Sequence, residues 1–318
     1  MKKRRLLWGL LYAGVFILVF VLSVIVKMTW NPLGDKYSAD WDESVGTVYT
    51  DLSYGPGEAN KFDLYVPADK SRETYALAVY LHPGGFTQGD KSGDAEMLQW
   101  LCSKGYVAAG INYTLLSEEH PDANIYTQSV EIRESIPFVM AEAEKLGYPL
   151  DRMAVAGGSA GFTLAMLYGY RDGPSSPLPV ELVFGAVGPS CFYPEDWDCF
   201  GFDQHPEAAA VMFSAMSGKP VTPEMFGTEG YEEVIRDISA VSWIGGDSAP
   251  TVCAYGALDK MQPFPASKRL AAALEEHGVP HEYIVFEHSG HGLQNDNRQY
   301  ARYMEKIEEY LETYLPVE

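Results

Sequence analysis

The sequence predicts an α/β protein with a mainly parallel central sheet, helices on both faces of the sheet and one N-terminal transmembrane helix before it. Along residues 45–318, short apolar runs of the buried-strand type alternate with helical patterns, as in sheets whose parallel strands are joined by crossover helices. Residues 1–30 instead hold a long uncharged run behind a cluster of basic residues, which is typical of a membrane span. Hydrophobic residues make up 47% of the 318-residue chain, enough to build a sizeable core.

Charge is unevenly distributed between the N-terminus and the rest of the chain. There are 23 Lys and Arg against 44 Asp and Glu, for a net charge of −21. Residues 1–30 contain five of the basic residues and no acidic one, so the remainder is strongly acidic. An acidic body argues against a nucleic-acid partner, which needs a positive surface. Four Cys in 318 residues exclude a fold held together by disulfides.

The N-terminal segment, residues 1–30, is interpreted as a signal anchor. Residues 6–26 carry no charge, and as a helix they would be roughly 31 Å long, matching the hydrocarbon core of a bilayer. Residues 2–5 are all basic, so the positive-inside rule predicts a single-pass protein with a cytoplasmic N-terminus and an extracellular body. The alternative is a cleaved signal peptide and a secreted protein. The anchor is favoured because signal h-regions are usually about 7–15 residues long and end at a small-x-small site.

Residues 31–44 are polar and are expected to form a linker to one catalytic domain, residues 45–318. Strands are expected where short apolar runs are bounded by turn residues, at 45–52, 61–66, 75–81, 107–113, 153–156, 181–187, 251–255 and 282–286. Helices are expected where apolar residues recur three and four apart, at 97–102, 125–146, 162–170, 266–277 and 299–314. Pro137 should kink or break the second of these helices.

Residues 191–245 interrupt the alternation of strands and helices. They contain four prolines among mixed aromatic and acidic residues. An excursion of this kind over the C-terminal edge of a sheet often forms a lid or a substrate pocket. We therefore expect this excursion to shape the substrate site.

Residues 157–161 read Gly-Gly-Ser-Ala-Gly, a G-x-S-x-G sequence centred on Ser159. The pattern directly follows the expected strand 153–156 and directly precedes a helical pattern. That is the strand–turn–helix setting of a nucleophile elbow, in which glycines allow a turn tight enough to expose the serine hydroxyl. The plain alternative is a glycine-rich helix start with a capping serine.

Residues 82–86 read His-Pro-Gly-Gly-Phe and directly follow the expected strand 75–81. Glycines at this place can bring backbone N–H groups close to a developing oxyanion. Pro83 has no N–H, so Gly84 and Gly85 would donate, together with the N–H of Ala160 behind the serine. An ordinary turn is the alternative.

With these motifs in place, the chain resembles the α/β-hydrolase superfamily. The resemblance is to its HGG-type esterase/lipase branch, which includes bacterial carboxylesterases and acetyl-xylan or feruloyl esterase-like proteins. The matching stretches are FDLYVP (62–67), YLHPGGFTQGDK (80–91), SKGYVAAGINY (103–113), DRMAVAGGSAGFTLAM (151–166) and the segment 249–292. Pro83 stands where the family has Gly, Thr114 where it often has Arg, and Phe162 where it often has Gly. These departures concern the choice of substrate more than the mechanism.

In this family the acid and the base follow the nucleophile in the order Ser, Asp or Glu, His. Asp259 lies just after the expected strand 251–255, at the end of a parallel strand where sites form, and it resembles the family's acid. Asp247 lies before that strand, at its wrong end. His291 sits between glycines after the last strand and is expected to be the base, in preference to His288. His291 would take the proton of Ser159, and Asp259 would hold the imidazole.

The resemblance implies a serine carboxylester hydrolase that acts through an acyl-enzyme on a small or carbohydrate-linked ester, with no cofactor. One alternative is a serine peptidase of the prolyl-oligopeptidase kind, although 318 residues leave no room for its large gating domain. The other alternative is a catalytically inactive hydrolase fold that serves as a binding module. Retention of the serine, aspartate and histidine argues against it.

Two groups inside the excursion have alternative interpretations. Glu195, Asp196 and Asp198 could suggest a metal, but they lack a nearby histidine and a rigid spacing, so a solvated acidic loop is favoured and no metal is expected. Cys191 and Cys199 are either a disulfide or two free thiols, since an external domain would allow a bond.

Overall fold

A computed structural model describes residues 2–29, 37–197 and 200–317 of the chain. The chain divides into two compact units, Met1–Ser38 and Ala39–Glu318. The first contains one helix, α1 (Lys2–Thr29), which includes the whole uncharged run. Every side chain from residue 11 to residue 26 of this helix is exposed. Within the residues described, no helix combines the length and the apolar character needed to cross a membrane, so the transmembrane assignment stays a prediction.

The second unit is built on an eight-stranded sheet with the order β1-β2-β4-β3-β5-β6-β7-β8. β2 is antiparallel to both of its neighbours, and all pairs from β4 to β8 are parallel. The strands are β1 (Gly46–Ser53), β2 (Lys61–Pro67), β3 (Tyr75–Leu81), β4 (Val107–Ile111), β5 (Leu150–Gly158), β6 (Val180–Ala186), β7 (Thr251–Gly256) and β8 (His281–Phe286). The prediction of a mainly parallel sheet is confirmed.

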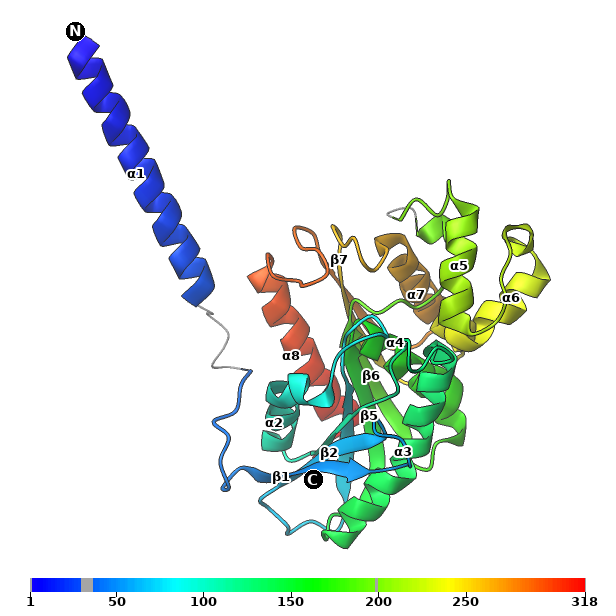
Figure 1. The fold of residues 1–318 in the computed structure, drawn as a ribbon. Coiled ribbons are helices and arrows are strands. Elements are labelled where there is room, and N and C mark those ends of the chain that lie inside the picture. Colours follow the sequence, from blue (N-terminus) through cyan, green and yellow to red (C-terminus); the bar gives the residue numbers. More distant parts are fainter. Residues whose placement is uncertain (1, 30–36, 198–199, 318) are drawn as a thin grey trace. The chain divides into compact units, whose positions relative to one another are not determined.

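Helices cover both faces of the sheet (Figure 1). On one side lie α2 (Ala95–Ser103) and α8 (Asn297–Tyr314), joined by an ion pair of 2.6 Å between Lys104 and Glu308. On the other side lie α3 (Ile125–Lys145), α4 (Ala160–Leu167) and α7 (Phe264–Glu276). The break expected at Pro137 is wrong, because α3 continues through it. Ile132, Ile136 and Val139 are fully buried on the same helix, and their burial offsets the cost of about 3 kcal/mol for an internal proline.

The strand order creates a topological switch point at the carboxyl ends of the central strands. β3 is flanked by β4 on one side and β5 on the other, so the connections that leave β3 and β5 run in opposite directions. Ligands bind outside such a switch point in open α/β sheets. The segments that follow these two strands are the glycine-rich residues 82–90 and the turn at Ser159, so both expected motifs share one edge.

The excursion is described over residues 191–197 and 200–245 and packs around its own aromatic cluster. Trp197 is 1% exposed, and its ring lies 5.7 Å from the rings of both Phe192 and Phe213. Cys191 is a free, buried thiol, while Asp198 and Cys199 lie outside the described residues. The helices of the excursion are α5 (Pro206–Ser217) and α6 (Glu229–Ile235), and its short helical turns are η4 (Pro194–Asp196), η6 (Pro223–Met225), η7 (Arg236–Ile238) and η8 (Ala240–Trp243). Elsewhere in the domain the short helical turns are η1 (Lys91–Asp94), η2 (Tyr168–Asp172) and η3 (Gly173–Ser175).

Candidate active site

Ser159 occupies a strained turn between β5 and α4. Its backbone has φ 51° and ψ −121°, a conformation that non-glycine residues rarely adopt and that is often found at functional sites. The turn brings two segments of backbone very close: a Cβ on Gly161 would lie 1.9 Å from the carbonyl oxygen of Leu81. Only glycine fits there, so the glycine two residues after the serine is a requirement of packing. The strand–turn–helix setting predicted for the G-x-S-x-G sequence is therefore present.

His291 links the serine to the aspartate. Its Nε2 lies 2.9 Å from Oγ of Ser159, and its Nδ1 lies 2.8 Å from Oδ2 of Asp259. The imidazole comes from the loop after β8 and the carboxylate from the loop after β7. Three side chains that are far apart in sequence thus form one continuous chain of hydrogen bonds. In this arrangement an imidazole can take the proton of a hydroxyl while a carboxylate orients the imidazole.

The carboxylate of Asp259 is held by its own loop. Its side chain is 1% exposed, and Oδ1 accepts hydrogen bonds from the N–H groups of Met261 (2.8 Å) and Gln262 (3.0 Å). Because both backbone donors bind one oxygen, the other oxygen is turned toward His291.

The two residues considered as alternatives to Asp259 and His291 lie elsewhere: Asp247 is exposed in the loop before β7, and His288 contacts Asp296.

The glycine loop after β3 carries unused donors. Gly84 has φ 140° and Gly85 has φ 60°, so the turn takes a path that side chains disfavour. Within the described residues, the N–H groups of Gly84, Gly85 and Ala160 donate to no acceptor. Free N–H groups at the end of β3 and at the start of a helix suit a developing negative charge.

A histidine and a tyrosine fix the start of this loop. The ring of His82 is stacked on that of Tyr113, with 4.3 Å between centroids, and the hydroxyl of Tyr113 donates to the carbonyl of His82 at 2.8 Å. Burial lowers the pKa of His82, which favours the neutral imidazole. The sequence interpretation missed Tyr113, although it directly follows Asn112 and the end of β4, the same edge as the glycine loop.

Two acidic residues of the excursion face an arginine. Asp196 is 7% exposed and forms an ion pair with Arg269 of α7, while Glu195 lies 3.1 Å from the same guanidinium. The expectation of a solvated loop is therefore wrong for Asp196, which is buried and paired with Arg269. Among the described residues, no three His, Cys, Asp or Glu side chains gather as metal ligands would.

Together, the fold and the serine–histidine–aspartate arrangement define the class of the chain, an α/β-hydrolase with a serine, a histidine and an aspartate linked at the edge of its sheet. The chain belongs to the BD-FAE family, whose model matches residues 62–274. The resemblance expected from the sequence is thus confirmed.

Individual relatives agree with this class. The chain is 26% identical over 222 residues to the probable carboxylic ester hydrolase LipM of Mycobacterium tuberculosis, a match that covers 67% of this chain and 48% of LipM. The chain thus spans about half the length of LipM and of the esterase LipQ from the same organism, which is 23% identical over 234 residues.

Two solved structures show the same fold. Esterase B from Lactobacillus rhamnosis has a TM-score of 0.65 and 18% identity, covering 94% of this chain and 95% of that one. A truncated carbohydrate esterase from gut microbiota has a TM-score of 0.67 and 17% identity, covering 86% and 99%. At these identities the likeness defines the architecture of the sheet and helices, and the chemistry rests on the residues at the site.

Proposed function

We propose that this protein is a serine carboxylester hydrolase that works through an acyl-enzyme, with Ser159 as nucleophile, His291 as base and Asp259 as orienting acid. The observation that carries the proposal is the chain of hydrogen bonds from Ser159 through His291 to Asp259, at 2.9 and 2.8 Å. Membership of the BD-FAE family supports it.

The proposed mechanism has two half-reactions. His291 takes the proton of Ser159 as Oγ attacks the ester carbonyl, and the resulting imidazolium is stabilised by Asp259. The N–H groups of Gly84, Gly85 and Ala160 donate hydrogen bonds to the oxyanion, and the loss of one such donor typically costs about 2.7–4 kcal/mol of transition-state stabilisation. His291 then gives its proton to the leaving alcohol. Water, activated by the same imidazole, releases the carboxylic acid and regenerates Ser159.

The first experiment tests the nucleophile. Full-length protein is assayed with p-nitrophenyl acetate and treated with a fluorophosphonate probe, and the labelled peptide is identified by mass spectrometry. We expect the label on Ser159, and we expect Ser159→Ala to abolish both turnover and labelling. The matched control is Ser71→Ala, an exposed serine in the loop before β3. Labelling at another serine, or an inert native protein, would contradict the proposal and favour a binding module.

We also propose a small or carbohydrate-linked ester as the substrate class. The resemblance to acetyl-xylan and feruloyl esterase-like proteins supports this choice, and a solved structure with the same fold is a carbohydrate esterase. A panel of p-nitrophenyl esters of increasing chain length, methyl ferulate, acetylated xylan and a proline p-nitroanilide tests it. The highest kcat/KM is expected on a short-chain or carbohydrate ester. Preference for the anilide would indicate a peptidase instead.

We further propose that α1 anchors the protein in a membrane, with the N-terminus in the cytoplasm and the catalytic domain outside. The support is the uncharged run of residues 6–26 behind four basic residues, together with the exposure of the apolar side chains at 11–26, which would be costly in water. The test is alkaline extraction and external protease treatment of whole cells, with intact mass measured on the product. Release by alkali, or a mass lacking residues 1–30, would refute the uncleaved anchor.

A further inference from the structure

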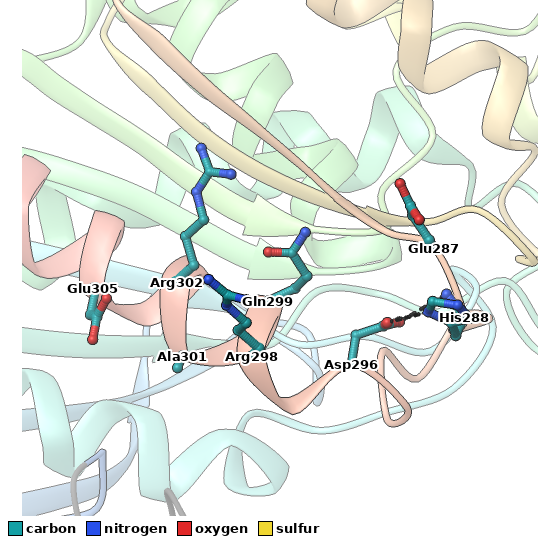
Figure 2. A pocket seen from close by; sticks show the side chains of 8 residues that line it. All are labelled: Glu287, His288, Asp296, Arg298, Gln299, Ala301, Arg302 and Glu305. Carbon is teal, nitrogen blue, oxygen red and sulfur yellow. Dashed lines mark hydrogen bonds and ion pairs between the residues drawn. The ribbon is translucent and has the colours of Figure 1, made fainter.

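The loop that carries His291 is closed on itself by Asp296. One carboxylate oxygen of Asp296, Oδ2, accepts two hydrogen bonds, from the N–H of His288 at 3.0 Å and from Oγ of Ser289 at 2.6 Å. The other carboxylate oxygen, Oδ1, lies 2.9 Å from Nδ1 of His288, and Figure 2 shows the two side chains pointing toward each other. These contacts join the start of the loop to its end, so residues 288–296 form a closed ring with His291 in it.

Ser289 connects this ring to the loop of the catalytic aspartate. It is fully buried, and its Oγ accepts the N–H of Asn295 at 3.0 Å while donating to Asp296. Its carbonyl accepts the N–H of Leu258 at 3.0 Å. Since Leu258 directly precedes Asp259, one buried residue links the backbone that presents the base to the backbone that presents the acid.

Packing alone does not hold the His291 loop in place. The side chain of His291 is 25% exposed. A surface pocket borders the ring formed by residues 288–296. The pocket is lined by Asp296 and His288 together with Arg298 and Arg302 of α8 (Figure 2), and none of Ser159, Asp259 and His291 lines it. With open space on that flank, directional hydrogen bonds must fix the loop. A displacement of the base by about 1 Å can cost on the order of a hundredfold in rate.

We propose that Asp296 and Ser289 are positioning residues, which hold the His291 loop so that the imidazole reaches Ser159 and Asp259 together. The inference rests on the proposed function. Neither residue touches the reacting atoms, and both act through the backbone of residues 288–296. The hydroxyl of Ser289, with help from His288, lowers the pKa of Asp296, so the carboxylate that accepts these hydrogen bonds is charged at neutral pH.

The kinetic test uses Asp296→Ala and Ser289→Ala in the full-length protein. For p-nitrophenyl acetate we expect kcat to fall about ten- to a hundredfold, with KM changed less than about threefold. His288→Ala should have a smaller effect, since that side chain is 78% exposed. Asp247→Asn, an exposed carboxylate before β7, is the control that should change nothing.

A second readout does not need turnover. The proton shared by Nδ1 of His291 and Asp259 should give a low-field proton NMR signal, assigned by its loss in His291→Ala. We expect Asp296→Ala to weaken that signal, and Asp296→Asn, which keeps one oxygen acceptor, to weaken it less and to retain more activity. An unchanged signal and kcat within twofold of the native value in folded Asp296→Ala would overturn the proposal. If native protein hydrolyses no ester but its signal still depends on Asp296, the proposed function fails while the positioning role stands.

Discussion

The ammonium group of Lys91 lies 3.1 Å from the carboxylate of Asp63, and both side chains are only 5% exposed. Asp51, which is 72% exposed, contacts the same ammonium group at 2.8 Å. Lys91 directly follows the glycine loop, and its backbone N–H donates to Oδ1 of Asn112 at 2.7 Å. A buried ion pair therefore fixes the far end of the loop that presents Gly84 and Gly85.

Replacing Lys91 by Met should destabilise the protein by about 3 kcal/mol, because the carboxylate of Asp63 would stay buried without its cation. The double variant Lys91→Met/Asp63→Asn should recover part of this loss, since the uncompensated charge is gone. Urea unfolding gives the free energies. Lys145→Met, which removes a surface ion pair, should change stability by less than about 0.5 kcal/mol. Equal unfolding midpoints for Lys91→Met and native protein would contradict the role of the pair.

The two glycines of the loop after β3 should respond differently to alanine. A Cβ on Gly84 would lie 1.7 Å from the carbonyl oxygen of Gln88, whereas a Cβ on Gly85 would meet nothing within 4 Å. Gly84→Ala must therefore displace the loop and its N–H donors, and kcat should fall about 10²–10³-fold, as when an oxyanion donor is lost. Gly85→Ala keeps its N–H in place and should cost less than about tenfold, chiefly from strain. Steady-state kinetics on the two folded variants measure these losses, and an equal fall in kcat for Gly84→Ala and Gly85→Ala would contradict the prediction.

The sequence predicted the sheet well because its signals are local. Each expected strand overlaps an observed one, and the parallel strands, which are buried on both faces, read as continuous apolar runs. Ser159, Asp259 and His291 could be placed because each lies in the segment that follows a strand, at the same edge of the sheet. The observed geometry brings together the three residues that the order of motifs had selected.

The supports of the site could not be predicted in the same way. Asp296 and Lys91 are ordinary charged residues in sequence, and their function in the fold depends on partners reached through space, His288 and Asp63. The same holds for Asp196, which is buried and pairs with Arg269 on a helix distant in sequence. A charge pattern along the chain carries no information on such pairs until the elements are assembled. Pro137 is the opposite case: the proline predicts a break from the local sequence, but α3 continues through it because the surrounding residues of the helix are buried.

Arg269 should stabilise the excursion through its contacts with η4. Its guanidinium pairs with Asp196 and lies 4.6 Å from the ring centroid of Tyr193. Replacing Arg269 by Met leaves the buried carboxylate of Asp196 without its cation, and we expect residues 191–245 to open more often. Limited proteolysis should cut this segment about tenfold faster than in native protein, on the order of 1.4 kcal/mol in opening free energy. Lys268→Met, its exposed neighbour, is the matched control, and equal cleavage rates for Arg269→Met and the control would contradict the contact.

Asp94 should make the stability of the protein depend on pH. One carboxylate oxygen, Oδ2, is buried without a hydrogen-bond partner among the described residues, and burial raises the pKa of Asp94 to about 7 from the usual 3.8. Between these two values the folded protein binds a proton that the unfolded chain does not, so stability falls as pH rises through that window. The penalty is absent below about pH 4 and fully present above about pH 7.

Replacing Asp94 by Asn should remove this dependence. From pH 5 to pH 8, native protein should lose about 2–3 kcal/mol more unfolding free energy than Asp94→Asn, at about 1.4 kcal/mol for each unit of pKa difference. At pH 8 the variant should be the more stable of the two, because it buries an amide in place of a charge. Urea unfolding of both proteins at pH 5 and pH 8 measures the difference, with Glu96→Gln on the exposed side of α2 as the control. If the unfolding free energies of native protein and Asp94→Asn change equally between pH 5 and pH 8, the prediction is wrong. Asp94 would then titrate in its ordinary range, with water bound to its carboxylate.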